Sequence, residues 1–94
     1  MTKIEIDMKK GILHAKGHAG FARYGQDVVC AAVSALTQTA AAAAEKRGGK
    51  AQTEDGAISI QCENAEYRTV LEAITEGLRM IARQYPLYVR VKVR

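Results

Sequence analysis

Few of the residues that mark the common classes of functional site are present in this chain of 94 residues. It contains two cysteines and two histidines, and they form neither a C-x-x-C nor an H-x-x-x-H motif, which argues against a zinc site. A glycine-rich phosphate-binding motif is also missing. We therefore expect no metal and no cofactor, and we expect both cysteines to be free thiols in a reducing compartment.

Long apolar runs are missing as well. The first five residues lack the apolar centre of a secretory signal, and no stretch looks long enough to span a bilayer. We therefore expect a cytoplasmic protein with no membrane partner. The formal net charge is +4, with lysine and arginine spread along the chain, which permits contact with RNA but does not require nucleic acid as a partner.

The composition is that of an ordinary folded protein, with 48% hydrophobic and 26% charged residues. At this length we expect residues 1–94 to form a single domain with one modest core. Oligomerisation would help to stabilise so small a core.

Apolar and polar residues alternate in several segments, which predicts strands. Residues 4–17 read as a β-hairpin. Residues 50–54 and 57–63 flank Asp55-Gly56, the strongest hairpin signal in the chain, and Cys62 falls on the core side of the second strand. Residues 87–94 alternate strictly, which predicts a half-buried last strand with Leu87 and three valines on one face.

Two segments are predicted to be helices. Residues 28–47 are rich in alanine, with Asp27 as the N-cap and Gly48-Gly49 as the stop. Residues 65–85 follow Asn64 with apolar residues at helical spacing, and Pro86 ends them. The order ββαββαβ fits an α+β two-layer sandwich, in which a mostly antiparallel sheet carries two helices on one face.

The candidate chemistry lies in one stretch, where His18 stands in a glycine-rich loop and Cys30 begins the first helix. Cysteine attacks as the thiolate, which a helix N-terminus and a neighbouring imidazolium both favour. His18 can act as general base toward Cys30 and then as acid toward a leaving amine, if the loop brings the imidazole within reach. Backbone amides around Cys30 are candidates for an oxyanion hole.

For other residues of this stretch the evidence for a functional role is weaker. Asp27 either orients His18 or only caps the helix, and capping needs nothing beyond local geometry. Ser34 lies one turn after Cys30 on the same face and is a candidate for a supporting hydrogen bond. The loop itself supplies candidate substrate contacts, in which the aromatic residues form part of a lid or wall: Gly20, Phe21, Tyr24 and Gly25.

The runs 17–22 (GHAGFA) and 25–34 (GQDVVCAAVS), with the Asp55-Gly56 hairpin and the Val-Lys-Val-Arg ending, resemble the ribosomal-processing cysteine protease family, Prp. The resemblance covers nearly the whole chain. It implies a cytoplasmic, homodimeric endopeptidase with His18 as base and Cys30 as nucleophile. It also implies a substrate: the short N-terminal extension of a large-subunit ribosomal protein, cut after a pair of aromatic residues.

Three alternatives stay open at this point. Similar sequences occur beside phage head genes, where the substrate is a capsid protein. A non-catalytic domain that binds RNA or the ribosome would explain the basic last strand, although that strand lacks the usual aromatic motif. A redox sensor would need Cys62 exposed and close enough to Cys30 for a disulfide.

Overall fold

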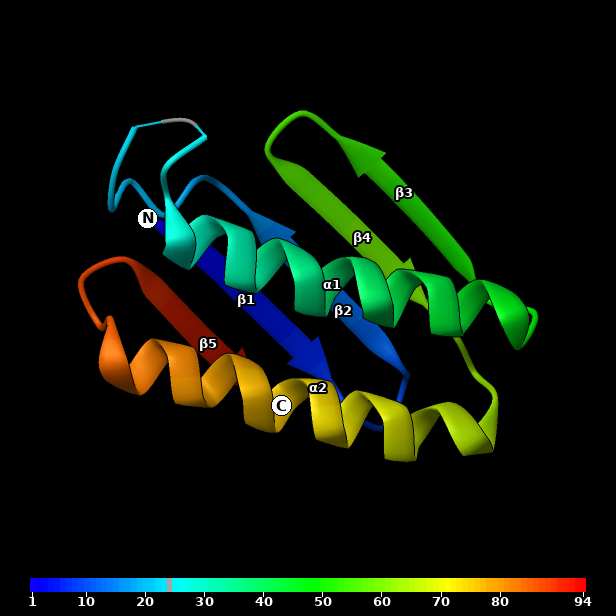
Figure 1. The fold of residues 1–94 in the computed structure, drawn as a ribbon. Coiled ribbons are helices and arrows are strands. Elements are labelled where there is room, and N and C mark those ends of the chain that lie inside the picture. The colour runs from blue at the N-terminus through cyan, green and yellow to red at the C-terminus, as the bar shows by residue number, and fades with distance from the viewer. Residues whose placement is uncertain (24) are drawn as a thin grey trace.

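The computed structural model describes residues 1–23 and 25–94 (Figure 1). Its elements follow the predicted order: β1 (Thr2–Asp7), β2 (Ile12–Lys16), α1 (Val28–Lys46), β3 (Lys50–Glu54), β4 (Ala57–Gln61), α2 (Ala65–Gln84) and β5 (Val89–Val93).

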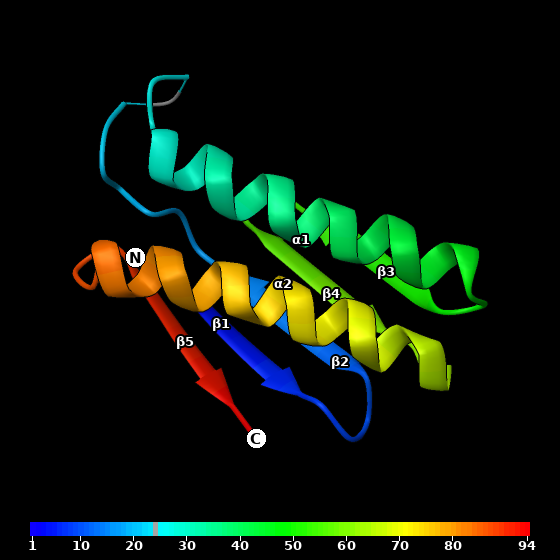
Figure 2. The same ribbon diagram turned by 60° about the horizontal axis from the view of Figure 1, so that its bottom comes forward.

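The five strands form one mixed sheet in the order β3-β4-β2-β1-β5. Three of the four strand pairs are antiparallel, and only β1 and β5 run parallel. Both helices lie on the same face of the sheet, side by side and roughly along the strands (Figures 1 and 2). The structure therefore confirms the predicted two-layer α+β sandwich with a mostly antiparallel sheet.

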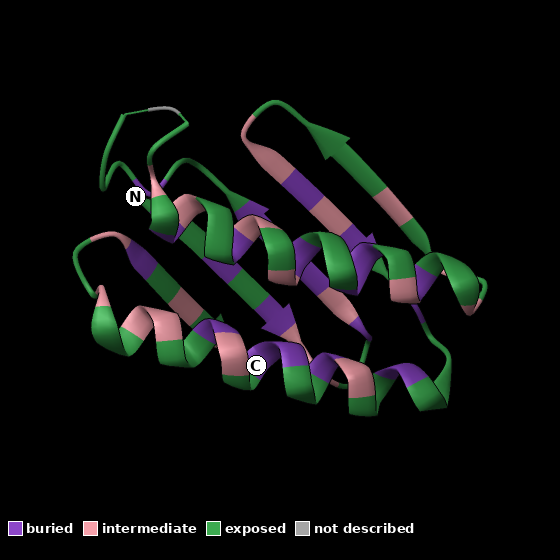
Figure 3. Cartoon of the chain, viewed as in Figure 1, coloured by how far each residue is buried: buried purple, intermediate pink, exposed green. Residues whose placement is uncertain are grey.

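The core lies between this sheet face and the two helices, because alternate strand residues and one side of each helix are buried (Figure 3). Among the described residues, the aromatic side chain that is fully buried is that of Tyr67 on α2, which donates its hydroxyl hydrogen to the carbonyl of Ala40 on α1 at 2.7 Å. Burial raises the pKa of Tyr67 to about 12. This hydrogen bond satisfies the hydroxyl and joins the two helices in the interior.

Helix α1 buries small residues, including Ala40, Ala41 and Ala44, toward the core. Small side chains on this side let its backbone lie close to α2 and the sheet. In length and composition α1 is also apolar enough to cross a membrane, which the search for long apolar runs did not anticipate. In this structure it is a core helix of the sandwich, with its buried side against the sheet and α2.

The last strand starts later than predicted. Tyr88 and Val89 both donate their amide hydrogens to the carbonyl of Tyr85, so the chain turns through residues 86–88 before β5 begins. Leu87 stands in this turn with 77% of its surface exposed. Its predicted place on the buried face is therefore wrong, whereas Val89 is buried as expected. Strand β4 also ends two residues early, at Gln61, although Cys62 is still buried.

Candidate active site

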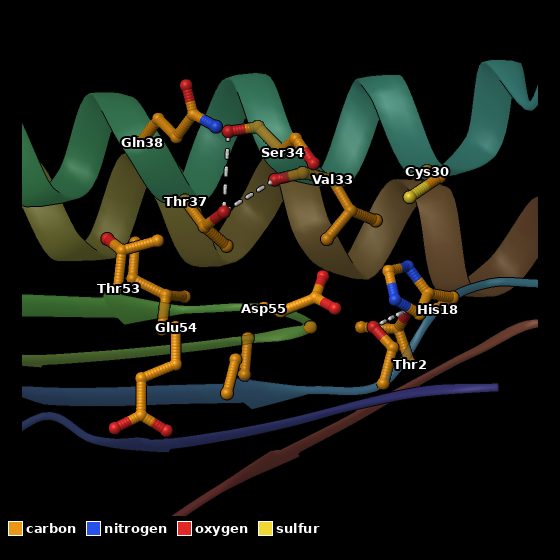
Figure 4. Close-up of a pocket in the computed structure, with 15 residues that line it drawn as sticks. Thr2, His18, Cys30, Val33, Ser34, Thr37, Gln38, Thr53, Glu54 and Asp55 are labelled. Carbon is orange, nitrogen blue, oxygen red and sulfur yellow. Dashed lines mark hydrogen bonds between the residues drawn. The ribbon is translucent and has the colours of Figure 1, made fainter. Parts of the chain in front are cut away.

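A cleft of about 330 Å³ opens between the N-terminal half of α1 and the β3–β4 turn. His18 and Cys30 both line it, although they are 12 positions apart in the sequence (Figure 4). The cleft also includes Ser34 from α1 and Asp55 and Gly56 from the turn. The fold thus brings the two predicted reactive residues to one surface depression.

Cys30 occupies the first turn of α1 and is half-buried. Figure 4 shows its thiol on the wall of the cleft that faces the imidazole of His18. Among the hydrogen bonds of the described residues, none joins the Cys30 thiol to the His18 imidazole (Figure 4). Hydrogen bonds between catalytic groups are commonly long without substrate and tighten only when substrate binds. The thiol is therefore placed for access from the cleft.

Asp27 is the N-cap of α1, and its two carboxylate oxygens have separate roles. Oδ1 accepts the amide hydrogen of Cys30 at 2.8 Å, and Oδ2 accepts those of Phe21 at 2.9 Å and Ala22 at 3.4 Å. Partial desolvation works against ionisation, but these backbone hydrogen bonds prevail and lower the pKa of Asp27 below its usual value. Asp27 thus caps the helix and fastens the preceding loop to it, and its hydrogen bonds go to backbone amides.

Two of the backbone amides around Cys30 that were candidates for an oxyanion hole already have acceptors in this structure. The amide of Cys30 donates to the Asp27 side chain, and the amide of Ala31 donates to the Asp27 carbonyl at 3.0 Å. An oxyanion would have to compete with the N-cap for these two donors, so the oxyanion hole at this helix start stays a prediction.

His18 follows the end of β2 and is exposed to solvent. The backbone before it is fixed by two contacts: the Gly17 amide donates to the Gly56 carbonyl at 2.7 Å, and the Thr2 hydroxyl donates to the Gly17 carbonyl at 3.3 Å. Gly56 itself has a φ of 75°, which favours glycine, and a Cβ there would lie 3.2 Å from Nε2 of His18. The imidazole therefore lies against the backbone of the β3–β4 turn.

The first residues of the loop after His18 are packed against the rest of the protein. Ala19 is buried in the core with 2% exposure, and the ring of Phe21 makes edge-to-face contacts with Tyr85 at 5.4 Å and Tyr88 at 5.3 Å between ring centres. Phe21 keeps 42% of its surface exposed. These contacts attach the loop to the corner between α2 and β5, away from the cleft lining.

The remaining loop candidates are glycines and a tyrosine. Gly20 and Gly25 have φ values of 75° and 85°, and a Cβ at either would meet open space. Tyr24 lies outside the described residues. Ser34 lines the cleft one turn after Cys30, as its spacing predicts, and its carbonyl accepts the hydroxyl hydrogen of Thr37 at 3.3 Å.

The whole-chain comparisons identify the family. The family model described as cysteine protease Prp matches residues 1–90. This chain belongs to the Prp cysteine protease family. As a Prp family member it is a cysteine protease, and the arrangement of thiol and imidazole in one cleft is consistent with that activity.

Individual relatives support the same family assignment. A ribosomal processing cysteine protease Prp from Mycoplasma pneumoniae is 33% identical over 93 residues, which are 95% of this chain and 91% of the relative. The crystal structure of an S. aureus Prp with a covalently linked product peptide superposes with a TM-score of 0.89 at 24% identity, covering both chains fully. A Streptococcus mutans protein superposes with a TM-score of 0.73 at 25% identity, covering 98% of this chain and 90% of that one. The solved structures share the Prp fold with this chain.

Cys62 has no place in this Prp site. It is buried with 3% exposure, and its sulfur lies 3.8 Å from the carbonyl of Ala44, near the far end of α1. At about 1.5 Å per residue, Ala44 is about 21 Å along the helix from Cys30. A disulfide between Cys30 and Cys62 cannot form across that distance, which rules out the redox-sensor alternative in this form.

Within residues 1–23 and 25–94, no three side chains of the metal-binding types gather closely enough to hold an ion. The cleft does contain one residue that the search for catalytic residues in the sequence overlooked. Asp55 was assigned only to the hairpin turn, and the structure places it in the cleft with His18. A hairpin signal says where the chain reverses, but only the sheet order shows that this turn lies beside the end of β2.

Proposed function

We propose that this chain is an endopeptidase that removes the short N-terminal extension of a large-subunit ribosomal protein, cutting after aromatic residues. Cys30 is the nucleophile and His18 is the general base. The observation that carries the proposal is the single cleft that contains both side chains in a member of the Prp cysteine protease family.

The proposed reaction has two halves. His18 takes the proton of Cys30, and the sulfur attacks the scissile carbonyl carbon to form a tetrahedral intermediate. The carbon–nitrogen bond then breaks as His18 returns the proton to the leaving amine. In the second half His18 takes a proton from water and the water oxygen attacks the acyl carbon. The carbon–sulfur bond then breaks, the carboxylic acid product leaves, and His18 returns the proton to the sulfur.

The imidazole is the main source of thiolate stabilisation in this proposal. A helix N-terminus favours negative charge through its unsatisfied amides, but at α1 the carboxylate of Asp27 already accepts the amide hydrogen of Cys30. An imidazolium at His18 faces the thiol across the cleft. Removal of His18 should therefore impair attack more than a change at the helix end would.

The substrate assignment rests on the relatives. The Mycoplasma pneumoniae relative, which matches nearly the whole chain, is named a ribosomal processing protease. The preference for aromatic residues before the cut comes from the resemblance to the family. The same source supports a homodimer, and the catalytic thiol supports a reducing, cytoplasmic location, because an oxidised sulfur could not attack.

The test is cleavage of a synthetic peptide that carries a pair of aromatic residues, followed by mass spectrometry of the products. We expect one cut after the aromatic pair with the unmodified protein, and none with Cys30→Ala or His18→Ala. The matched control is Cys62→Ala, which alters the other cysteine in the core and should leave the cut unchanged. Cleavage that survives in Cys30→Ala, or is lost in Cys62→Ala with the fold intact, would contradict the assignment.

A second peptide, with both aromatic residues replaced by alanine, tests the specificity. We expect it to resist cleavage. Equal cleavage of both peptides would leave the protease assignment standing and remove the aromatic preference. Size-exclusion chromatography with light scattering measures the oligomeric state, for which we expect the mass of a dimer.

A further inference from the structure

The imidazole of His18 lies between two walls of the cleft. On one side is Cys30 on α1, and on the other is the β3–β4 turn (Figure 4). Nε2 is the ring atom closest to that turn, at 3.2 Å from the Cβ position of Gly56, whereas Cδ2 and Cε1 are at 3.8 and 3.9 Å. The geometry therefore directs Nε2 at the turn and leaves Nδ1 for the side where the thiol lies.

Asp55 precedes Gly56 in this turn and places its carboxylate in the cleft. Figure 4 shows the carboxylate directed toward the space between α1 and His18, whereas that of its neighbour Glu54 points away, to the other side of the sheet. Both residues line the cleft, but they differ in where their charge lies. The third nearby carboxylate, that of Asp27, is held by backbone amides.

Backbone hydrogen bonds fix the turn relative to His18. The Gly17 amide donates to the Gly56 carbonyl at 2.7 Å, so the residue before the histidine is tied to the residue after the aspartate. The pairing of β2 with β4 extends to Lys16 and Ala57, directly next to this contact. The backbone on which both side chains stand is thus fixed by the sheet pairing. In the part of the chain that the structure describes, no hydrogen bond joins the Asp55 carboxylate to the imidazole, so a contact between these two groups would form by side-chain rotation (Figure 4).

We propose that Asp55 is a positioning residue for His18: its carboxylate accepts the Nε2 hydrogen, which leaves Nδ1 unprotonated to take the proton of Cys30. A histidine that acts through one ring nitrogen needs its hydrogen on the other, and an acceptor there fixes the tautomer and the ring orientation. When the thiol proton moves to Nδ1, the carboxylate faces the resulting imidazolium. The proposal rests on the proposed roles of His18 and Cys30.

Turn geometry must be separated from this role, because aspartate before glycine also favours the hairpin. Asparagine and glycine are both good turn residues, but only asparagine supplies an oxygen that can accept the Nε2 hydrogen. We therefore compare Asp55→Gly with Asp55→Asn. Asp7→Gly is the matched control, since it removes the aspartate of the other hairpin turn, which accepts the amide hydrogen of Lys10 and does not line the cleft.

Two measurements are made on each variant: kcat and KM for the aromatic peptide, and the rate at which Cys30 alone is alkylated by iodoacetamide. We expect Asp55→Gly to lower kcat by about tenfold or more with KM unchanged, and to slow alkylation of Cys30. Asp55→Asn should recover part of the lost kcat and part of the lost alkylation rate, and Asp7→Gly should match the unmodified protein in both. Thermal melting should show the variants folded at the assay temperature.

The outcomes separate this proposal from the proposed function. If kcat and alkylation in Asp55→Gly equal those of the unmodified protein, or if Asp55→Asn is no better than Asp55→Gly, the role of Asp55 is overturned. If the unmodified protein cuts no aromatic peptide but its alkylation still depends on Asp55, the substrate assignment fails and the role of Asp55 is supported.

Discussion

Replacement of Gly56 by alanine should damage catalysis much more than it damages folding. The φ of 75° is unfavourable for alanine by about 1–2 kcal/mol, and the lower entropy of the unfolded alanine chain offsets roughly half of that. A net loss of about 1 kcal/mol lowers the Tm of a domain of this size by about 4–8 °C. The new methyl group would also lie 3.2 Å from Nε2 of His18, which is closer than ordinary contact, so the imidazole must shift.

A shift of a few tenths of an ångström in a general base is expected to lower kcat by about tenfold. The matched control is Gly48→Ala, because Gly48 has a φ of 80° and open space where its Cβ would stand. The two variants should therefore lose similar stability in thermal unfolding, while only Gly56→Ala loses turnover in the peptide assay. Equal kcat in the two variants would refute the placement of the imidazole against this turn.

Two further predictions concern the groups that hold the site and the core together. Asp27→Ala removes the helix cap and should cost about 1 kcal/mol of unfolding free energy in denaturant titration. Because the pKa of Asp27 is lowered in the folded protein, the ionised carboxylate should stabilise the fold above its ordinary pKa of 3.8, and this stabilisation should disappear as the pH falls below that value. If the unfolding free energy of Asp27→Ala falls with acidification as steeply as that of the unmodified protein, this reasoning is contradicted. Tyr67→Phe should cost about 1 kcal/mol through the lost hydrogen bond to Ala40. Because the pKa of Tyr67 is raised from 10.0 to about 12, the unmodified protein should lose stability as the pH rises through that interval, and the variant should lose less.

Local patterns were enough to predict most of the fold. Alternation in residues 4–17, the Asp-Gly turn and the alanine-rich segment each describe interactions between near neighbours in the chain, and each appears in the structure at nearly the predicted bounds. The N-cap at Asp27 is local in the same sense, since its oxygen reaches an amide three residues ahead. The half-buried last strand was placed two residues early because Pro86 and Leu87 belong to a turn.

Long-range placement was not predictable from these patterns. The parallel pairing of β1 with β5 joins the two ends of the chain, and nothing in either strand alone specifies it. The location of Asp55 beside His18 depends on β4 pairing with β2, so spacing along the chain gave no sign of it. The burial of Ala19 within a glycine-rich loop depends on the same tertiary packing.

The central claim is that His18 and Cys30 act as one catalytic unit, and a double-mutant cycle tests it most directly. It measures kcat/KM on the aromatic peptide for the unmodified protein, His18→Ala, Cys30→Ala and the double variant. Residues that act as a unit are strongly non-additive, so we expect the double variant to be no slower than Cys30→Ala alone. Losses that simply add, or substantial turnover in Cys30→Ala, would contradict the account.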